Sequence, residues 1–211
     1  RSVLGWDDQA LKQGQDIPQS LTVQVKEHNV TLRPDFVIVT PSDLPNPGVP
    51  RMLVQVYPSD VGLERALRTP GSAWSATPAT RMMELLHGSG VRLGLVTNGE
   101  HWMLVDAPRG QTTGFVSWYA QYWLEEKVTL QAFRTLLSVP RFFGVGERDR
   151  IEALLAESAS DQQEVTDQLG YQVRRAVEVL VQAIDRIDRE RKGARLLGVT
   201  EKQRYEAALT L

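Results

Sequence analysis

Two apolar stretches decide the fold expected for this chain: RPDFVIV at residues 33–39 and MLVQVY at residues 52–57. Residues 36–39 form a continuous apolar run, which predicts a strand buried on both faces. Residues 52–57 predict a second strand, which carries one polar side chain, Gln55, and is followed by a proline. A proline-rich loop at residues 42–50 connects the two, so the strands are expected to be neighbours in one sheet.

The rest of the first half predicts a mixture of strands and helices. Asn98-Gly99 is a dipeptide typical of a tight hairpin turn, and Thr77 before Pro78 is typical of a helix start. The expected helices cover residues 5–16, 78–87 and 129–137, and the expected further strands cover residues 21–25, 91–96, 101–105 and 114–119.

The sequence changes in character near residue 145. No proline follows Arg148, and apolar residues recur at helical spacing from Ile151 to Ile187. We therefore expect two parts, an α/β domain over residues 1–145 and a helical segment over residues 146–211.

Composition excludes several classes of function. Hydrophobic residues make up 42% and charged residues 24%, which is too apolar for a disordered chain. No apolar run approaches the length that spans a bilayer, so no membrane partner is expected. The absence of cysteine excludes a disulfide scaffold, a thiol nucleophile and cysteine-ligated zinc, and it fits a cytoplasmic location. The chain begins with Arg1 and ends within a helical pattern, so we expect a domain of a longer protein.

The strand pair has the spacing of a metal-dependent phosphodiesterase centre. Asp35 opens the first strand, and position 55 lies within the second. Carboxylates at these two positions would supply the oxygen ligands that Mg²⁺ prefers. A lysine two residues after the second acid would share its face of the strand, and it could act on the attacking water while the metal polarises the phosphate.

Pro34-Asp35 and the strand 52–57 resemble the core of the PD-(D/E)XK nucleases. The segment LVTNGEHWMLV at residues 95–105 is similar to the strand pair that follows this core in type I and type IIG restriction enzymes. Residues 74–110 resemble the N-terminal region of defence-associated adenine methylases, which include restriction–methylation fusions and the methylases of the BREX and DISARM phage-defence systems. Residues 201–211 resemble the helix that leads into their methylase domain. The resemblance implies a restriction-endonuclease-like α/β fold, with a mixed sheet flanked by helices and followed by a C-terminal helical segment.

One departure from the family pattern bears directly on activity. The nuclease motif is acid-x-Lys, whereas this chain has Gln55-Val56-Tyr57. Glutamine offers an uncharged oxygen and tyrosine carries no positive charge, and the loss of one such electrostatic group costs roughly 10²–10³ in rate. The resemblance therefore makes Asp35 and Gln55 the catalytic positions of a degenerate nuclease, with Asp35 the metal ligand if any metal binds. The nearby acids that could supply a displaced carboxylate, none of them at the required spacing, are Asp43, Asp60 and Glu64.

The resemblance also sets the expected cofactors. Mg²⁺ is needed only if the nuclease is active, and S-adenosylmethionine belongs to the methylase part, whose Asn-Pro-Pro-Tyr motif does not occur here. No cofactor is therefore expected in this chain by itself, and it is not expected to be catalytic alone. The parent protein is expected to be a DNA adenine methyltransferase, a restriction endonuclease or both.

Basic residues are the candidates for DNA contact. The formal net charge is −2, but residues 171–204 hold nine Lys or Arg against five Asp or Glu. The interspersed acids also fit an ordinary solvated helix face, or a face that docks on the methylase part. Phosphate contacts would be salt-dependent and indifferent to base sequence. The candidate nucleic-acid-binding residues are Arg33, Arg174, Arg175, Arg189, Arg191 and Lys192.

Three functional hypotheses are open at this point. The first is a degenerate nuclease core that positions DNA or scaffolds the chain's own methylase domain. The second is an active Mg²⁺-dependent endonuclease with an unusual centre at Asp35 and Gln55. The third is a protein-interaction module without DNA contact. Nuclease ancestry requires the strands 36–39 and 52–56 to be adjacent, with Asp35 facing Gln55 in an open cleft.

Overall fold

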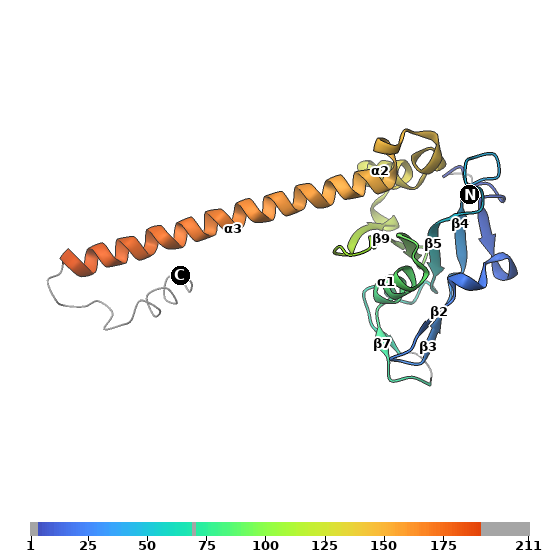
Figure 1. Ribbon diagram of the computed structural model, residues 1–211, viewed down its shortest axis with the longest axis horizontal. Coiled ribbons are helices and arrows are strands. Elements are labelled where there is room, and N and C mark those ends of the chain that lie inside the picture. The colour runs from blue at the N-terminus through green and yellow to red at the C-terminus, as the bar shows by residue number, and fades with distance from the viewer. Residues whose placement is uncertain (1–3, 69–70, 191–211) are drawn as a thin grey trace. The chain divides into compact units, whose positions relative to one another are not determined.

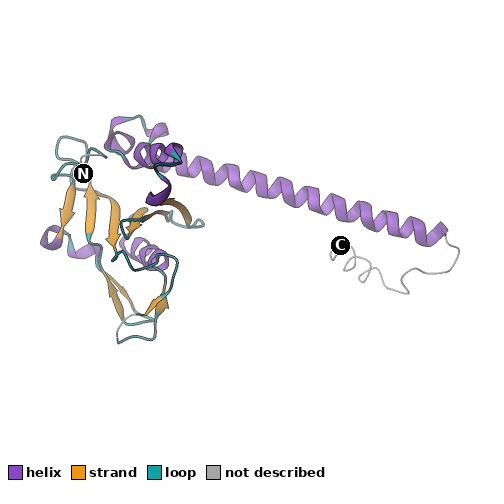
Figure 2. Ribbon diagram, turned by 180° about the vertical axis from the view of Figure 1, so that it is seen from behind, coloured by secondary structure: helices purple, strands orange, loops and turns teal. Residues whose placement is uncertain are grey.

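The computed structural model describes residues 4–68 and 71–190 (Figure 1). The chain divides into two units, residues 1–155 and residues 156–211, and each is described by itself. The strands are β1 (Leu11–Gln13), β2 (Val23–Val25), β3 (Val30–Leu32), β4 (Phe36–Val39), β5 (Pro50–Val56), β6 (Leu67–Arg68), β7 (Ser75–Ala76), β8 (Leu93–Thr97), β9 (His101–Asp106) and β10 (Gly114–Tyr119). The helices are α1 (Pro78–Ser89), α2 (Lys127–Leu137) and α3 (Ile151–Glu190), with short helical turns at Gly14–Asp16, Gln19–Leu21, Ala120–Tyr122, Pro140–Gly144 and Glu147–Asp149 (Figure 2).

A mixed sheet organises the first unit. Its six strands lie in the order β1-β4-β5-β8-β9-β10 within the described part of the chain. The central pair β5 and β8 is parallel, and every other neighbouring pair in this sheet is antiparallel. The parallel pair requires a crossover connection, and α1 provides it. The two remaining pairs, β2–β3 and β6–β7, form small separate sheets. The expected mixed α/β architecture with flanking helices is therefore confirmed.

Both faces of the sheet are covered, because side chains along each strand alternate between them. On one face, Leu53 and the strands beside it pack against α1 through Met82 and Leu85. On the other face, Met52 packs with α2 and the start of α3, which contribute Phe133 and Ile151. Four of these side chains, Leu53, Met82, Leu85 and Ile151, are completely buried. The first unit is therefore a three-layer α/β/α arrangement with a hydrophobic core on each side of the sheet.

Helix α1 begins and ends where local sequence signals predict. The Thr77 hydroxyl accepts a hydrogen bond from the Thr80 backbone N–H at 3.1 Å, and Pro78 occupies the first turn. At the other end, Gly90 has a φ of +75° and donates its N–H to the Leu86 carbonyl at 2.9 Å. A left-handed residue at this position favours glycine.

The prediction of a helix over residues 5–16 was wrong. Residues Leu11–Gln13 form the edge strand β1, which pairs with β4, and Gly14–Asp16 form a single 3-10 turn. Gly14 has a φ of +56°, which ends any regular helix at that point. The hydrogen bonds offered by β4 are gained only when two segments distant in sequence meet, so no local pattern shows them.

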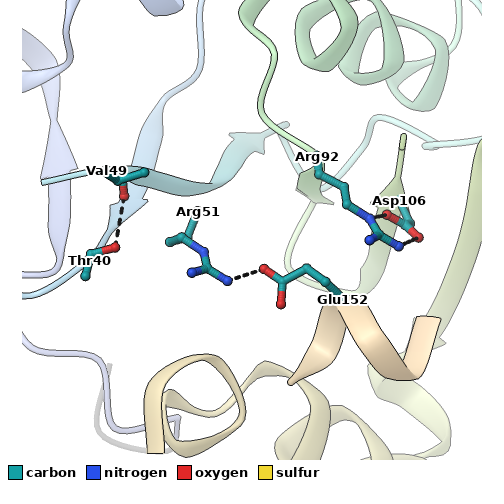
Figure 3. A network of polar contacts seen from close by, with 6 residues as sticks. All are labelled: Thr40, Val49, Arg51, Arg92, Asp106 and Glu152. Atoms are coloured by element: carbon teal, nitrogen blue, oxygen red, sulfur yellow. Dashed lines mark hydrogen bonds and ion pairs between the residues drawn. The ribbon is translucent and has the colours of Figure 1, made fainter. Parts of the chain in front are cut away.

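One ion pair within the first unit fixes the start of α3 to the sheet, and a second pair lies beside it. Figure 3 shows Arg51, at the beginning of β5, in an ion pair with Glu152 of the first turn of α3. Beside it, Arg92 donates from Nε and Nη2 to the two carboxylate oxygens of Asp106 at 2.6 and 2.8 Å. A bidentate pair of this kind fixes both side chains. Together with the buried Ile151, the Arg51–Glu152 pair anchors the root of α3 on the sheet.

Among residues 4–68 and 71–190, no helix combines the length and the apolar character that crossing a bilayer would need.

Candidate functional site

Backbone hydrogen bonds hold Asp35 against β5, the strand that carries Gln55. Strands β4 and β5 are antiparallel, with Phe36 opposite Val54 and Val37 opposite Leu53. Just before β4, the Asp35 backbone N–H donates to the Val54 carbonyl at 2.9 Å. Gln55 lies two residues after Leu53 and so shares with it the face of β5 that α1 covers. That Asp35 faces Gln55 stays a prediction.

The Asp35 side chain is exposed but held in place. Its Oδ2 atom accepts a hydrogen bond from the Val56 backbone N–H at 2.8 Å, across the gap to β5. The Oδ2 atom of Asp35 is thus engaged at the end of the neighbouring strand. The Oδ1 atom has no hydrogen-bond partner in the described structure.

Gln55 and Tyr57 occupy the positions of the missing acid and lysine. Residues two apart on a strand project to the same side, and the Tyr57 hydroxyl donates weakly to Gln55 Oε1 at 3.5 Å. Gln55 is 8% exposed, so it is a buried polar residue of the core edge. Its Oε1 has this one long contact, and its amide nitrogen has no hydrogen-bond partner among the described residues. The pair is neutral: Gln55 accepts through Oε1 and Tyr57 donates, and neither side chain supplies a carboxylate for a cation.

Arg81 of α1 lies beside Tyr57, although sequence reasoning did not single it out. Burial raises the pKa of the Tyr57 hydroxyl, the charge of Arg81 lowers it, and that of Asp35 raises it again. Tyr57 packs against the cluster that contains Trp74 and Ala76, and Arg81 stacks over that indole ring at 5.0 Å. Arg81 donates from Nε to the Ala76 carbonyl at 3.3 Å and from Nη2 to the Leu67 carbonyl at 2.5 Å. The sequence contained one indication of where Arg81 lies. A crossover helix after β5 must start near the carboxyl end of that strand, and Arg81 lies in the first turn of this helix.

The oxygen atoms that Asp35 and Gln55 offer do not fit the ligand requirements of a divalent cation. Mg²⁺ takes six oxygen ligands, usually with one or two carboxylates supplied by the protein. Asp35 offers one free carboxylate oxygen, and the buried carbonyl of Gln55 is uncharged and faces Tyr57. Within the described part of the chain, no three His, Cys, Asp or Glu side chains gather into a group that could hold a metal. No catalytic step through a metal is therefore derived from this geometry.

Glu64, a candidate for the displaced carboxylate, takes part in a separate cluster. It accepts a hydrogen bond from the Tyr119 hydroxyl at 2.8 Å, beside a hollow of about 290 Å³ lined also by Asn98 and His101. The His101 ring stacks on Tyr119 with 4.2 Å between centroids, and its Nε2 is buried without a partner in the described structure. Burial lowers the pKa of His101, and Glu64 opposes that shift.

The basic residues predicted to bind nucleic acid lie in different environments. Arg33 donates through Nη2 to the Gly14 carbonyl at 2.7 Å and the Ile17 carbonyl at 3.2 Å, so its guanidinium supports the loop after β1. The exposed members on α3, in the second unit, are Arg174, Arg175 and Arg189. Arg191 and Lys192 lie outside the described residues.

The mixed sheet with flanking helices and the long C-terminal helix agree with the restriction-endonuclease-like fold expected of the N-terminal region of a restriction–modification methylase. Comparison with family models agrees: residues 12–183 match the model described as MmeI, N-terminal domain. The chain therefore belongs to the MmeI N-terminal domain family, the N-terminal region of a type IIG restriction–modification enzyme. Searches of curated proteins and of solved structures gave no match.

Proposed function

We propose that this domain is a degenerate PD-(D/E)XK nuclease core that positions DNA for the methylase part of a restriction–modification protein. The observation that supports the proposal is the hydrogen bond from the Val56 backbone N–H to Asp35, which holds this carboxylate beside the strand that carries the neutral Gln55 and Tyr57 at the acid-x-Lys positions. On this proposal the framework of the centre is kept while two of its three charged groups are absent.

The size of the expected loss supports a non-cleaving role. Each missing electrostatic group costs roughly 10²–10³ in rate, so two independent losses would cost about 10⁴–10⁶. A lost metal site removes in addition the Lewis acid that polarises the phosphate. Positioning DNA needs neither contribution, and this role requires no metal or other cofactor in the domain itself.

The link to the methylase part is the second element of the proposal. Helix α3 starts on the sheet through Ile151 and the Arg51–Glu152 pair and continues into the second unit with exposed arginines. On this proposal, α3 is the covalent connection between the nuclease-like core and the methylase part. S-adenosylmethionine would be bound in that following part, and DNA would be handled in the cytoplasm.

Plasmid cleavage with Mg²⁺ and with Mn²⁺ tests the proposal. The wild-type chain is expected to leave supercoiled plasmid intact. The double substitution Gln55→Glu with Tyr57→Lys restores acid-x-Lys on the same strand and is expected to give metal-dependent nicking. The matched control adds Asp35→Ala to that double variant and should abolish the nicking. Wild-type cutting that disappears in Asp35→Ala would instead establish an active nuclease with an unusual centre.

A further inference from the structure

The edge of the sheet at Asp35 has lost ligands for a cation but holds donors for an anion. The Gln55 amide, the Tyr57 hydroxyl and the Arg81 guanidinium can all donate hydrogen bonds. Asp35 and Arg81 carry formal charges of −1 and +1, Gln55 and Tyr57 carry none, and the group therefore has no net charge. Phosphate oxygens accept hydrogen bonds from such donors. With one carboxylate at this edge instead of two, a phosphate needs no metal ion to offset the repulsion of a second carboxylate.

Arg81 is pre-organised for such a contact. Its guanidinium stacks over the Trp74 ring at 5.0 Å to the centroid, while Nε and Nη2 bond to the carbonyls of Ala76 and Leu67. His28 stacks on the same indole ring, with 5.1 Å between centroids. The Nη1 group has no hydrogen-bond partner in the described structure. A guanidinium held in this way loses little side-chain entropy when a phosphate binds.

The topology of the sheet places Tyr57 and Arg81 at the same end of strand β5. The parallel pair β5–β8 is joined through α1, so the first turn of α1, with Arg81, lies at the carboxyl end of β5. Tyr57 directly follows β5 and packs against the cluster that contains Trp74 and Ala76. Ligands of open α/β sheets bind beyond the carboxyl ends of the parallel strands, and this is such an edge.

We propose that Asp35, Gln55, Tyr57 and Arg81 form a site that binds a backbone phosphate of duplex DNA directly, without a bridging divalent cation. Arg81 is the principal contact, Gln55 and Tyr57 orient the phosphate, and the Asp35 carboxylate opposes it. This inference rests on the proposed function, because it assigns a DNA contact to the same degenerate centre.

Fluorescence anisotropy with a labelled 30-base-pair duplex tests the site, using the full chain in EDTA and in Mg²⁺. Asp35→Asn keeps an acceptor for the Val56 N–H and removes the opposing charge, so DNA binding in EDTA is expected to tighten about fivefold. Arg81→Gln is expected to weaken binding and to reduce the slope of log K against log salt by about 0.9. Arg109→Gln removes the same charge from an exposed turn between β9 and β10 and should leave that slope unchanged.

Three outcomes would overturn the inference, and they differ in what they imply for the proposed function. Wild-type affinity that rises with Mg²⁺, with Asp35→Asn weakening binding, would show a metal-bridged site. DNA binding that neither Asp35→Asn nor Arg81→Gln alters would place the phosphate contact elsewhere and leave the proposed function standing. No detectable duplex binding at low salt would overturn both the inference and the proposed function. The Asp35→Asn result decides the matter even if Arg81→Gln does not fold.

Discussion

Gln55 and Tyr57 put an amide and a phenol at the end of β5. The Tyr57 hydroxyl donates to Gln55 Oε1 at 3.5 Å, and the carboxylate of Asp35 reaches across to the Val56 backbone N–H. Because hydrogen-bond register is set by the backbone, side chains at such positions can be exchanged without moving the strands. Our proposal of a degenerate centre depends on this separation of backbone geometry from side-chain chemistry.

His101 provides a pH-dependent prediction at the residue scale. Burial lowers the pKa of His101 in the folded chain, so the unfolded chain binds more protons below about pH 6.5. The stabilising effect of the neutral form is present above that pH and is lost as the pH falls. His101→Phe keeps the stacking on Tyr119 and removes the titrating imidazole. Between about pH 7.5 and pH 5.5, the Tm of this variant is therefore expected to fall less than the Tm of the wild type. The exposed His87→Gln serves as the control and should follow the wild type; an equal fall in His101→Phe would contradict the assignment.

Gly94 provides a packing prediction at the same scale. A Cβ atom there would lie 2.5 Å from Met82 Cγ and 3.0 Å from Leu86 Cδ1, at the contact between β8 and α1. Gly94→Ala is expected to lower the free energy of unfolding by about 1–3 kcal/mol, measured by urea denaturation. Gly114→Ala is the matched control, because a Cβ at Gly114 meets nothing within 4 Å. Equal effects at both glycines would show that close packing at β8 is not the cause.

At the scale of the element, α1 follows its local signals while β1 does not. The start of α1 depends on a cap and a proline that are adjacent in sequence. Strand β1 depends on pairing with β4, which lies more than twenty residues away. Local propensity therefore predicts the helix and fails for the strand.

Thr77 provides the prediction for α1. Its hydroxyl accepts from the Thr80 N–H and also contacts the Thr80 hydroxyl at 2.9 Å. Thr77→Ala is expected to reduce stability by about 1 kcal/mol, whereas Thr77→Ser should keep most of it. Thermal unfolding of the two variants measures the difference. If serine behaved like alanine, the methyl group rather than the cap would be responsible.

At the scale of the whole molecule, both hydrophobic cores of the sheet are complete by Leu155. Every buried member of the two clusters lies between Trp6 and Ile151. This distribution agrees with the division of the chain after Leu155. The first unit therefore contains the apolar burial that a cooperative fold requires.

Truncation tests that division. A fragment of residues 1–155 is expected to unfold in one cooperative transition. A fragment of residues 1–149 lacks the completely buried Ile151 and the Glu152 partner of Arg51, and it should be less stable by about 2–5 kcal/mol. Circular dichroism during urea unfolding compares the two. Equal stability of the fragments would show that the root of α3 contributes nothing to the first unit.

The sequence by itself determined the strands β4 and β5, the hairpin at Asn98-Gly99 and helix α1. These features follow from alternation, capping and turn chemistry, which act between residues close together in the chain. The family assignment extends the same information along residues 12–183.

Only the tertiary structure decided the edge strand β1, the use of Arg33 to hold loop carbonyls, and the placement of Arg81 beside Tyr57. Each depends on a contact between residues at least sixteen positions apart in the chain. The energy of such a contact comes from backbone pairing or from desolvated charge, and it exists only once the sheet and its crossover helix have assembled. For that reason the sequence identifies the neutral residues Gln55 and Tyr57, whereas only the fold places Arg81 in their neighbourhood.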